Sequence, residues 1–196
     1  MSAAASQSGR SMLEIIFVSM SAVALAEIGD KTQLLAILLA TRFSKPWPII
    51  AGIFVATIAN HFLAALAGSE VAGLFSGSWF RYFIGASFIA VGAWMLIPDK
   101  VEETSAGGDR FGAFVTTVIA FFLVEIGDKT QVATVVLGAR YHDVVSVTIG
   151  TTVGMMLANV PAVFLGHELL KHLPMNIVRL SAAGLFLVIG ALVILV

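Results

Sequence analysis

Residues 27–33 read Glu-Ile-Gly-Asp-Lys-Thr-Gln, and residues 125–131 repeat the same seven residues. Each copy lies inside a long apolar run, where ionisable groups are costly and therefore indicate a functional site. The chain of 196 residues is 59% hydrophobic and only 12% charged, with a mean hydropathy of +0.99. We interpret the two polar heptapeptides as the two halves of one cation site in a membrane transporter.

The apolar runs around the heptapeptides predict the fold class. Runs of about twenty apolar residues are typical of bilayer-spanning helices, and these runs are continuous rather than alternating, which excludes the pattern of a membrane barrel. We therefore expect an all-α integral membrane protein with six transmembrane helices. The predicted spans are Leu13–Thr41, Trp47–Ala67, Trp79–Ile97, Phe111–Ala139, Val144–Leu165 and Ile177–Val196.

An internal duplication organises these spans into two units. A shift of 98 residues superposes the chain on itself without a gap, so that Gly52 falls on Gly150 and Phe88 on Phe186. Each unit contains three apolar runs. Because three is an odd number, the second unit must enter the membrane from the opposite side, which makes an inverted repeat of the kind that forms transport sites near the midplane.

The domain organisation follows from this repeat. The first three-helix repeat is expected at residues 11–98 and the second at residues 111–196, joined by a polar linker at residues 99–110. Together they form one membrane domain. Residues 1–10 are small and polar, and we expect a disordered tail there.

The first span of each unit is longer than a bilayer needs. Residues 13–41 number 29, or roughly 43 Å of helix at 1.5 Å per residue, against a hydrocarbon core of about 30 Å. Each of these helices is therefore either strongly tilted or broken, with Gly29 and Gly127 as the expected break points. A broken helix would free backbone carbonyls beside the carboxylates.

Basic residues near the helix ends predict the orientation. One side of the membrane would carry Arg10, Arg81 and Arg140; the other would carry Arg42, Lys45, Lys100, Arg110, Lys171 and Arg179. Six against three favours the second side as cytoplasmic, which places both termini outside, in the periplasm of a bacterial inner membrane.

The composition also excludes several classes of site. The chain has no cysteine, so it has no disulfide framework, iron–sulfur cluster or thiolate metal site. The net charge of −1 provides no basic surface, so we expect no nucleic-acid partner. The expected partners are a divalent cation, protons and the lipid bilayer, with no bound cofactor. Because the duplication supplies both halves of the site, one monomer should function, even if it dimerises.

Helical spacing indicates which heptapeptide residues share a face. Glu27, Asp30 and Gln33 are three residues apart and extend one stripe, and Glu125, Asp128 and Gln131 repeat the arrangement in the second unit. If the two helices cross near their middles, four carboxylates and two amides converge. This all-oxygen shell suits a hard divalent cation such as Ca²⁺, Mn²⁺ or Mg²⁺ rather than Zn²⁺ or Cu⁺.

The same carboxylates predict proton coupling. Four anions cannot lie together unpaired at low dielectric, so the empty site should hold protons. A divalent cation should then displace those protons. Exchange of a cation for protons follows if alternating access carries one species in each direction.

The remaining polar residues of the heptapeptides have two interpretations each. Lys31 and Lys129 lie four residues after their glutamates, so they would either pair with carboxylates in the empty site or extend to the interface as anchors. A purely structural role for these Glu–Lys pairs is the alternative to a transport site. Thr32 and Thr130 fall off the carboxylate face and are expected to bond to backbone carbonyls. As an alternative, these threonines and the two lysines are candidates for outer ligands or a proton path.

A second set of polar residues lies in the second span of each unit. Asn60 and His61 occur in the first unit, and Asn159 falls at the position equivalent to His61. These side chains are candidates for outer ligands or a proton path. Interhelical hydrogen bonding, the usual role of polar residues in membrane bundles, is the interpretation that we favour for them.

These motifs resemble those of the uncharacterised protein family 0016. The family signature is Glu-x-Gly-Asp-(Lys/Arg)-(Thr/Ser), once in each of two three-helix repeats. The match is complete in Glu27–Thr32 and in Glu125–Thr130, and the repeat architecture covers nearly the whole chain. The short linker is similar to that of compact bacterial members.

The resemblance implies a cation/proton exchanger. Members of the family include bacterial manganese exporters and Golgi calcium/manganese–proton antiporters. Residue by residue, the resemblance implies that Glu27, Asp30, Glu125 and Asp128 form the cation site. We therefore expect a secondary transporter that exports Mn²⁺ from the cytoplasm, with Ca²⁺ as a further substrate.

Two alternatives carry different expectations. A divalent-cation channel or uniporter could use the same carboxylates, but it would conduct without proton counterflow. An intramembrane aspartyl protease would pair Asp30 with Asp128, but it would need neither the glutamates nor the exact duplication. We expect a transporter and not an enzyme.

Overall fold

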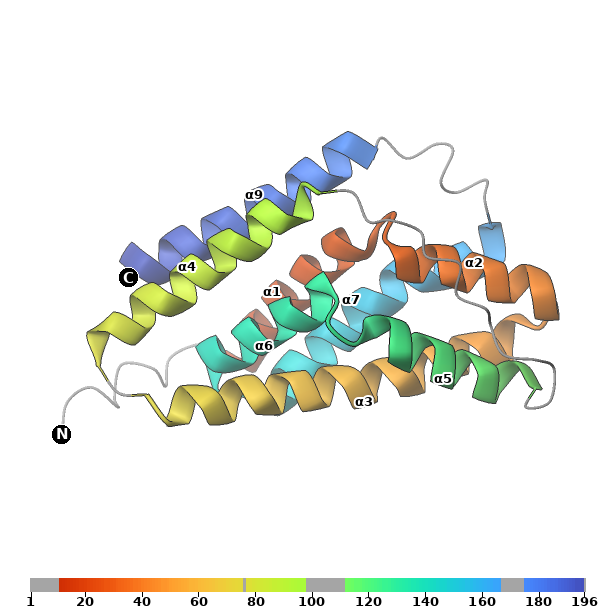
Figure 1. Cartoon of the computed structure of the whole chain (residues 1–196), viewed down its shortest axis with the longest axis horizontal. Helices are drawn as coiled ribbons and strands as arrows, with labels where there is room; N and C mark the ends of the chain where they lie inside the picture. The colour runs from red at the N-terminus through yellow and green to blue at the C-terminus, as the bar shows by residue number, and fades with distance from the viewer. Residues whose placement is uncertain (1–10, 76, 98–111, 167–174, 196) are drawn as a thin grey trace.

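The computed structural model describes residues 11–75, 77–97, 112–166 and 175–195, and all regular structure in them is α-helical (Figure 1). The predicted tail at residues 1–10 lies outside the described residues, as does the predicted linker at residues 99–110. The helices are α1 (Met12–Glu27), α2 (Lys31–Phe43), α3 (Pro46–Gly73), α4 (Ser78–Met95), α5 (Gly112–Glu125), α6 (Lys129–Tyr141), α7 (Val144–Leu165) and α9 (Met175–Leu195).

Among the described helices, α3, α7 and α9 are long and apolar enough to cross a bilayer. The pair α1 and α2 meets the same criterion as one span that is bent by 70° at a short break. The helix α5 is apolar but shorter, with 14 residues. The described residues therefore contain three candidate spans, or four with the bent pair, and the protein is a multi-pass helical membrane protein.

The predicted boundaries agree best where the apolar run ends at a capping residue. The span predicted at Val144–Leu165 matches α7 at both ends. In contrast, α3 continues past Ala67 to Gly73, although the sequence turns polar there. The extension is stabilised by packing, because Gly68 lies directly against the backbone of α6.

The long first span of each half is broken. Its length allowed either a strong tilt or a break, and the structure confirms the break. The first break separates α1 from α2, and the second separates α5 from α6 (Figure 1). Gly29 has a φ of +78° and Gly127 a φ of +77°. Only glycine adopts this left-handed conformation without a steric cost, so one glycine in each heptapeptide fixes the position of each break.

The two halves pack against each other through contacts that the repeat makes twice. The helix α1 runs along α7, and α3 runs along α5 and α6. A Cβ atom added at Gly52 of α3 would lie 2.7 Å from Cβ of Thr117 in α5. A Cβ atom added at Gly150 of α7 would lie 2.8 Å from Cβ of Ser19 in α1. These are equivalent positions, so small residues allow the same close helix approach in both halves.

The equivalent helices α4 and α9 pack as an antiparallel pair at one side of the molecule (Figure 1). Gly85 of α4 faces Gly190 of α9, and Gly92 faces Ala183. As the residue number rises along α4, the number of its partner on α9 falls, so the two helices run in opposite directions.

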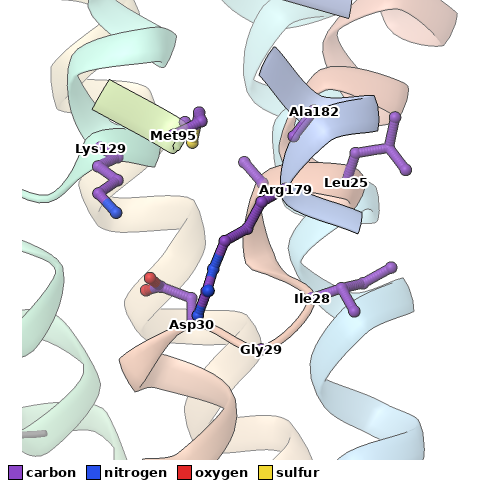
Figure 2. A pocket seen from close by; sticks show the side chains of 9 residues that line it. Leu25, Ile28, Gly29, Asp30, Met95, Lys129, Arg179 and Ala182 are labelled. Carbon is purple, nitrogen blue, oxygen red and sulfur yellow. The ribbon is translucent and has the colours of Figure 1, made fainter. Parts of the chain in front are cut away.

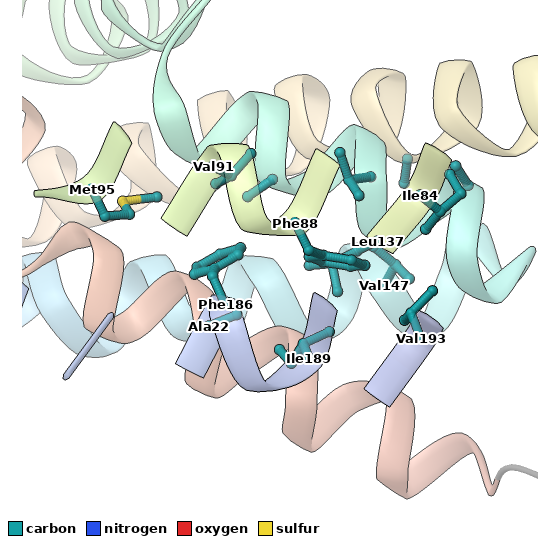
Figure 3. Close-up of a cluster of buried hydrophobic side chains, with 14 of the residues drawn as sticks. Ala22, Ile84, Phe88, Val91, Met95, Leu137, Val147, Phe186, Ile189 and Val193 are labelled. Atoms are coloured by element: carbon teal, nitrogen blue, oxygen red, sulfur yellow. The ribbon is translucent and has the colours of Figure 1, made fainter. Parts of the chain in front are cut away.

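A buried aromatic pair anchors α4 and α9 to the rest of the core. Phe88 and Phe186 are equivalent under the repeat, both are fully buried, and their ring centroids are 6.2 Å apart. Figure 3 shows them among Val91, Met95 and Ile189, with residues of α1, α6 and α7 in the same cluster. This cluster holds α4 and α9 against the helices that carry the heptapeptides.

The close glycine contacts predict a selective loss of stability. A Cβ atom at Gly138 of α6 would lie 2.8 Å from Cα of Ala65 in α3, whereas one at Gly184 of α9 would meet no described atom within 4 Å. We expect Gly138→Ala to destabilise the protein by about 1–3 kcal/mol through overpacking, measured as a lower midpoint of thermal unfolding in detergent. Gly184→Ala is the control and should leave the midpoint unchanged or slightly higher. Equal midpoints for the two variants would contradict the packing described for α3 and α6.

Candidate functional site

The two heptapeptides form the two helix breaks, so each places polar groups on both sides of a break. Glu27 is the last residue of α1, and Glu125 is the last residue of α5. Asp30 is the N-cap residue of α2, and Asp128 is the N-cap residue of α6. The positive end of a helix dipole favours a carboxylate at that position.

Three carboxylates from the two halves meet in the protein interior. Glu27, Glu125 and Asp128 each offer an oxygen within 4.8 Å of the other two. Their side chains are 0%, 2% and 3% exposed. The sequence predicted that four carboxylates would converge, and the structure brings three of them together.

The two threonines donate hydrogen bonds to this carboxylate cluster. Thr32 Oγ1 donates to Glu27 Oε2. Thr130 Oγ1 donates to Glu125 Oε1 at 2.5 Å and lies 3.2 Å from Asp128 Oδ2. The expectation that these threonines bond to backbone carbonyls is wrong. The break removes the regular helical geometry between each glutamate and its threonine, five residues later, and lets the hydroxyl reach the carboxylate.

Two carboxylate oxygens are left for a ligand. Glu27 Oε1 and Glu125 Oε2 are buried and have no hydrogen-bond partner among the described residues. Buried polar atoms without partners are rare in proteins and call for an explanation. An ion or a proton bound at the carboxylate cluster provides one.

The two lysines have different partners. Lys31 Nζ lies 2.9 Å from Asp128 Oδ1, so the ion pair crosses from the first half to the second. Lys129 Nζ, at the equivalent position, donates to the carbonyl of Ile97 at 2.6 Å, beyond the end of α4. For Lys31 this favours pairing with a carboxylate over anchoring at the interface, although the partner is not the glutamate four residues earlier.

The charges at the cluster suit a divalent cation. With its three carboxylates ionised and Lys31 protonated, the site carries three negative charges and one positive charge. The difference is a net charge of −2. One divalent cation or two protons would neutralise it.

The glutamines stabilise the backbone at the breaks. Gln33 Oε1 accepts a hydrogen bond from Gly29 N at 2.7 Å, and Gln131 Oε1 accepts one from Gly127 N at 2.6 Å. Gln33 Nε2 also donates to the carbonyl of Ala158 in α7 at 2.9 Å. In this structure the amide oxygens that were predicted to be ligands are engaged with the backbone. A role in cation binding remains a prediction for both glutamines.

Asp30 lies apart from the carboxylate cluster, in a small cavity of about 20 Å³ that it lines together with Lys129 and Arg179. Figure 2 shows the Arg179 side chain, from α9, extending towards Asp30. A cavity of this size has room for about one water molecule. No site role was predicted for Arg179, but its position inside an apolar run and its alignment with Arg81 are signals that could have identified it.

Asn60 and His61 of α3 and Asn159 of α7 are all buried but have different environments. Asn60 Nδ2 donates to the carbonyl of Phe122 at 3.1 Å, and Asn159 Nδ2 donates to the carbonyl of Met155 at 3.1 Å. The Asn60 bond joins α3 to α5, as expected for interhelical bonding, whereas the Asn159 bond stays within α7. His61 Nε2 lies 3.7 Å from Glu125 Oε1, so the structure brings His61 to the edge of the cluster.

One known family matches most of the chain. The family described as "Divalent cation/proton antiporter GDT1" matches residues 15–103 and 113–196 of the chain. Each of the two matched segments contains one heptapeptide. No solved structure matches the chain.

Three relatives cover most of the chain. A protein of Vibrio cholerae serotype O1 named "Putative manganese exporter" is 50% identical over 180 residues, which is 91% of this chain and 90% of the relative. "GDT1-like protein 5" of Arabidopsis thaliana is 28% identical over 218 residues, covering 92% of this chain and 95% of the relative. "GDT1-like protein 3" of Oryza sativa subsp. indica is 26% identical over 205 residues, covering 91% of this chain and 73% of the relative.

The hydrogen bonds of the glutamines predict unequal losses of stability. Gln33→Leu removes one buried and one partly buried hydrogen bond and leaves the N–H of Gly29 without its acceptor, so it should cost about 1–3 kcal/mol. Gln131→Leu removes one bond at a more exposed break and should cost less. Thermal unfolding of the two variants in the same detergent measures the difference. A larger loss for Gln131→Leu would show that the first break is not held in this way.

Proposed function

Because the chain belongs to the GDT1 family of divalent cation/proton antiporters, we propose that it exchanges Mn²⁺ for protons and exports Mn²⁺ from the cytoplasm. The observation that carries this proposal is the buried cluster of Glu27, Glu125 and Asp128 at the two helix breaks. The family is one of transporters and not of enzymes, so the protease alternative does not apply.

Cation binding at this cluster follows from the chemistry of its oxygens. Mn²⁺, Ca²⁺ and Mg²⁺ all bind carboxylate oxygens, and Glu27 Oε1 and Glu125 Oε2 have no other partner among the described residues. The name of the Vibrio cholerae relative supports Mn²⁺ as the main substrate. Ca²⁺ is the second candidate, since both ions take oxygen ligands.

Proton exchange follows from the electrostatics of the same residues. A net charge of −2 buried in a membrane protein is unstable, so the empty cluster binds protons. A divalent cation supplies the same positive charge as two protons. Occupancy by one therefore excludes the other, and this competition couples the two fluxes.

Six spans in two inverted repeats provide the framework for transport. The repeat contacts made by Gly52 and Gly150 support equivalent packing in the two halves. The antiparallel packing of α4 against α9 supports opposite orientations of those halves in the membrane. Equivalent but inverted halves let one chain adopt two states that expose the site to opposite sides.

A difference between the halves supports such alternation. Gly68 of α3 lies against the α6 backbone. A Cβ atom added there would lie 2.8 Å from the carbonyl carbon of Val135. At the equivalent Gly166, which follows α7, an added Cβ atom would meet no described atom within 4 Å. The contact between α3 and α6 would close one side, and the opposite state would close the equivalent contact between α7 and α2.

The aspartates would exchange places in the opposite state. In the present structure Asp128 belongs to the cluster, and Asp30 lies in the cavity with Lys129 and Arg179. By the repeat, the opposite state would bring Asp30 to the two glutamates. This exchange would explain why the two motifs carry four carboxylates although three of them meet at the site in one state.

The cellular setting that we propose is a bacterial inner membrane, since the relative at 50% identity is a bacterial protein. The distribution of basic residues near the helix ends favours both termini in the periplasm. Each half contributes a glutamate to the cluster, so one monomer forms a complete site.

Proton movement in proteoliposomes tests the proposal and separates it from a channel. Addition of Mn²⁺ outside should make the vesicle interior more alkaline as protons leave in exchange, with the membrane potential clamped. Glu27→Gln and Glu125→Gln should reduce both fluxes to the level of empty vesicles, because each removes one charge from the cluster. Glu14→Gln, at an exposed residue in the first turn of α1, is the matched control and should transport normally.

The same assay ranks the substrates when Ca²⁺ and Mg²⁺ are added in parallel. Entry of Mn²⁺ without a change in internal pH would support a channel or uniporter instead. Normal transport by both glutamate variants would contradict the proposed site.

A further inference from the structure

We propose that His61 supplies a nitrogen ligand to the transported cation and thereby makes the site select first-row transition metals over Ca²⁺ and Mg²⁺. This inference rests on the proposed cation site, and it specifies the class of cation that the site takes. It assigns a binding role to a residue outside both heptapeptides.

The position of the imidazole carries the inference. His61 is fully buried, and neither ring nitrogen has a hydrogen-bond partner among the described residues. Its Nε2 atom lies 3.7 Å from Glu125 Oε1. Two donor atoms that each lie about 2.2 Å from a shared cation are between about 3 and 4.4 Å apart, for angles from 90° to 180°. The observed separation allows one cation to bind both atoms.

The packing of α3 directs His61 towards the cluster. Its neighbour Asn60 donates a hydrogen bond to the carbonyl of Phe122 in α5, three residues before Glu125. Gly52, nearer the start of α3, approaches Thr117 of α5. These two contacts fix the rotation of α3 about its axis, so the position of the imidazole beside Glu125 is set by the fold.

The internal repeat shows that this nitrogen is present once. The equivalent residue in α7 is Asn159, whose Nδ2 donates to the Met155 carbonyl and lies 3.0 Å from the Met155 sulfur. Its remaining polar atom is an oxygen. The two halves therefore differ in donor type at one equivalent position, with nitrogen in the first half and oxygen in the second.

The donor type decides which cations are favoured. Ca²⁺ and Mg²⁺ bind oxygen ligands almost exclusively. Neutral imidazole is a common ligand of transition metals, and affinity for nitrogen sites rises from Mn²⁺ along the first row. A shell of carboxylates with one imidazole therefore accepts Mn²⁺ and the later divalent metals, and it gives Ca²⁺ and Mg²⁺ one ligand fewer.

Pulsed electron paramagnetic resonance of bound Mn²⁺ tests the ligand directly. The ion is paramagnetic, and a coordinated nitrogen modulates its electron spin echo. We expect nitrogen modulation for Mn²⁺ bound to the full-length protein in detergent. His61→Asn, which copies the residue at the equivalent position 159, should bind Mn²⁺ without that modulation. His142→Asn, at an exposed histidine with a φ of +53° that asparagine tolerates, should retain it.

Binding competition tests the selectivity. His61→Asn should weaken Mn²⁺ binding by about tenfold or more while changing Ca²⁺ binding by less than about threefold. Equal weakening for both ions would indicate a structural role and overturn the inference. The wild-type spectrum is an independent test, since it requires no variant to fold.

The outcomes separate this inference from the proposed function. Mn²⁺ binding with proton release, but without nitrogen modulation, would overturn the role of His61 and leave the carboxylate site intact. Failure of the wild-type protein to bind Mn²⁺ would overturn both.

Discussion

The burial of three carboxylates within 4.8 Å of one another is the constraint on which the rest of the structure depends. Two unit charges 4 Å apart interact by about 4 kcal/mol at an effective dielectric constant of about 20. Three like charges therefore generate a repulsion comparable to the whole stability of a typical domain, about 5–15 kcal/mol. Lys31 offsets part of this repulsion, and bound protons or a bound cation must offset the remainder. The requirement for positive charge links the fold to transport.

Two glycines make this arrangement possible in a helical membrane protein. A continuous helix would place each glutamate and the aspartate three residues later along one face, with the backbone closed by its own hydrogen bonds. The breaks at Gly29 and Gly127 turn the chain, so hydroxyls and carboxylates of both halves reach one point. Gln33 and Gln131 satisfy the backbone N–H groups exposed by the breaks. The polar backbone is thus tolerated because it is buried in protein.

Much of this arrangement is predictable from the sequence, because the duplication and the apolar runs are global patterns. The helical class, a tilt or a break in the first span of each half, and the meeting of the two heptapeptides follow from them. The details that depend on local geometry do not. Regular helical spacing could not place the hydroxyl of Thr32 on Glu27, since that bond requires the break. It also could not show that Lys31 pairs across the two halves with Asp128.

The difference between equivalent residues is the other feature that the sequence conceals. The two heptapeptides are identical, so the sequence predicts identical environments, yet Asp128 joins the cluster while Asp30 lies beside Arg179 (Figure 2). One conformation of an inverted repeat must treat its halves differently if it opens to one side only. The role that we propose for His61 is hidden for a related reason, because it depends on the rotation of α3 relative to Glu125.

Counting the protons released when Mn²⁺ binds tests whether the buried carboxylates exchange a cation for protons. Calorimetric titration of the purified protein, in buffers with different enthalpies of protonation, measures this number at equilibrium and independently of transport. We expect the release of about one to two protons for each Mn²⁺ bound near neutral pH, because the empty cluster must hold protons that the cation displaces. Binding of Mn²⁺ with no proton release would contradict it.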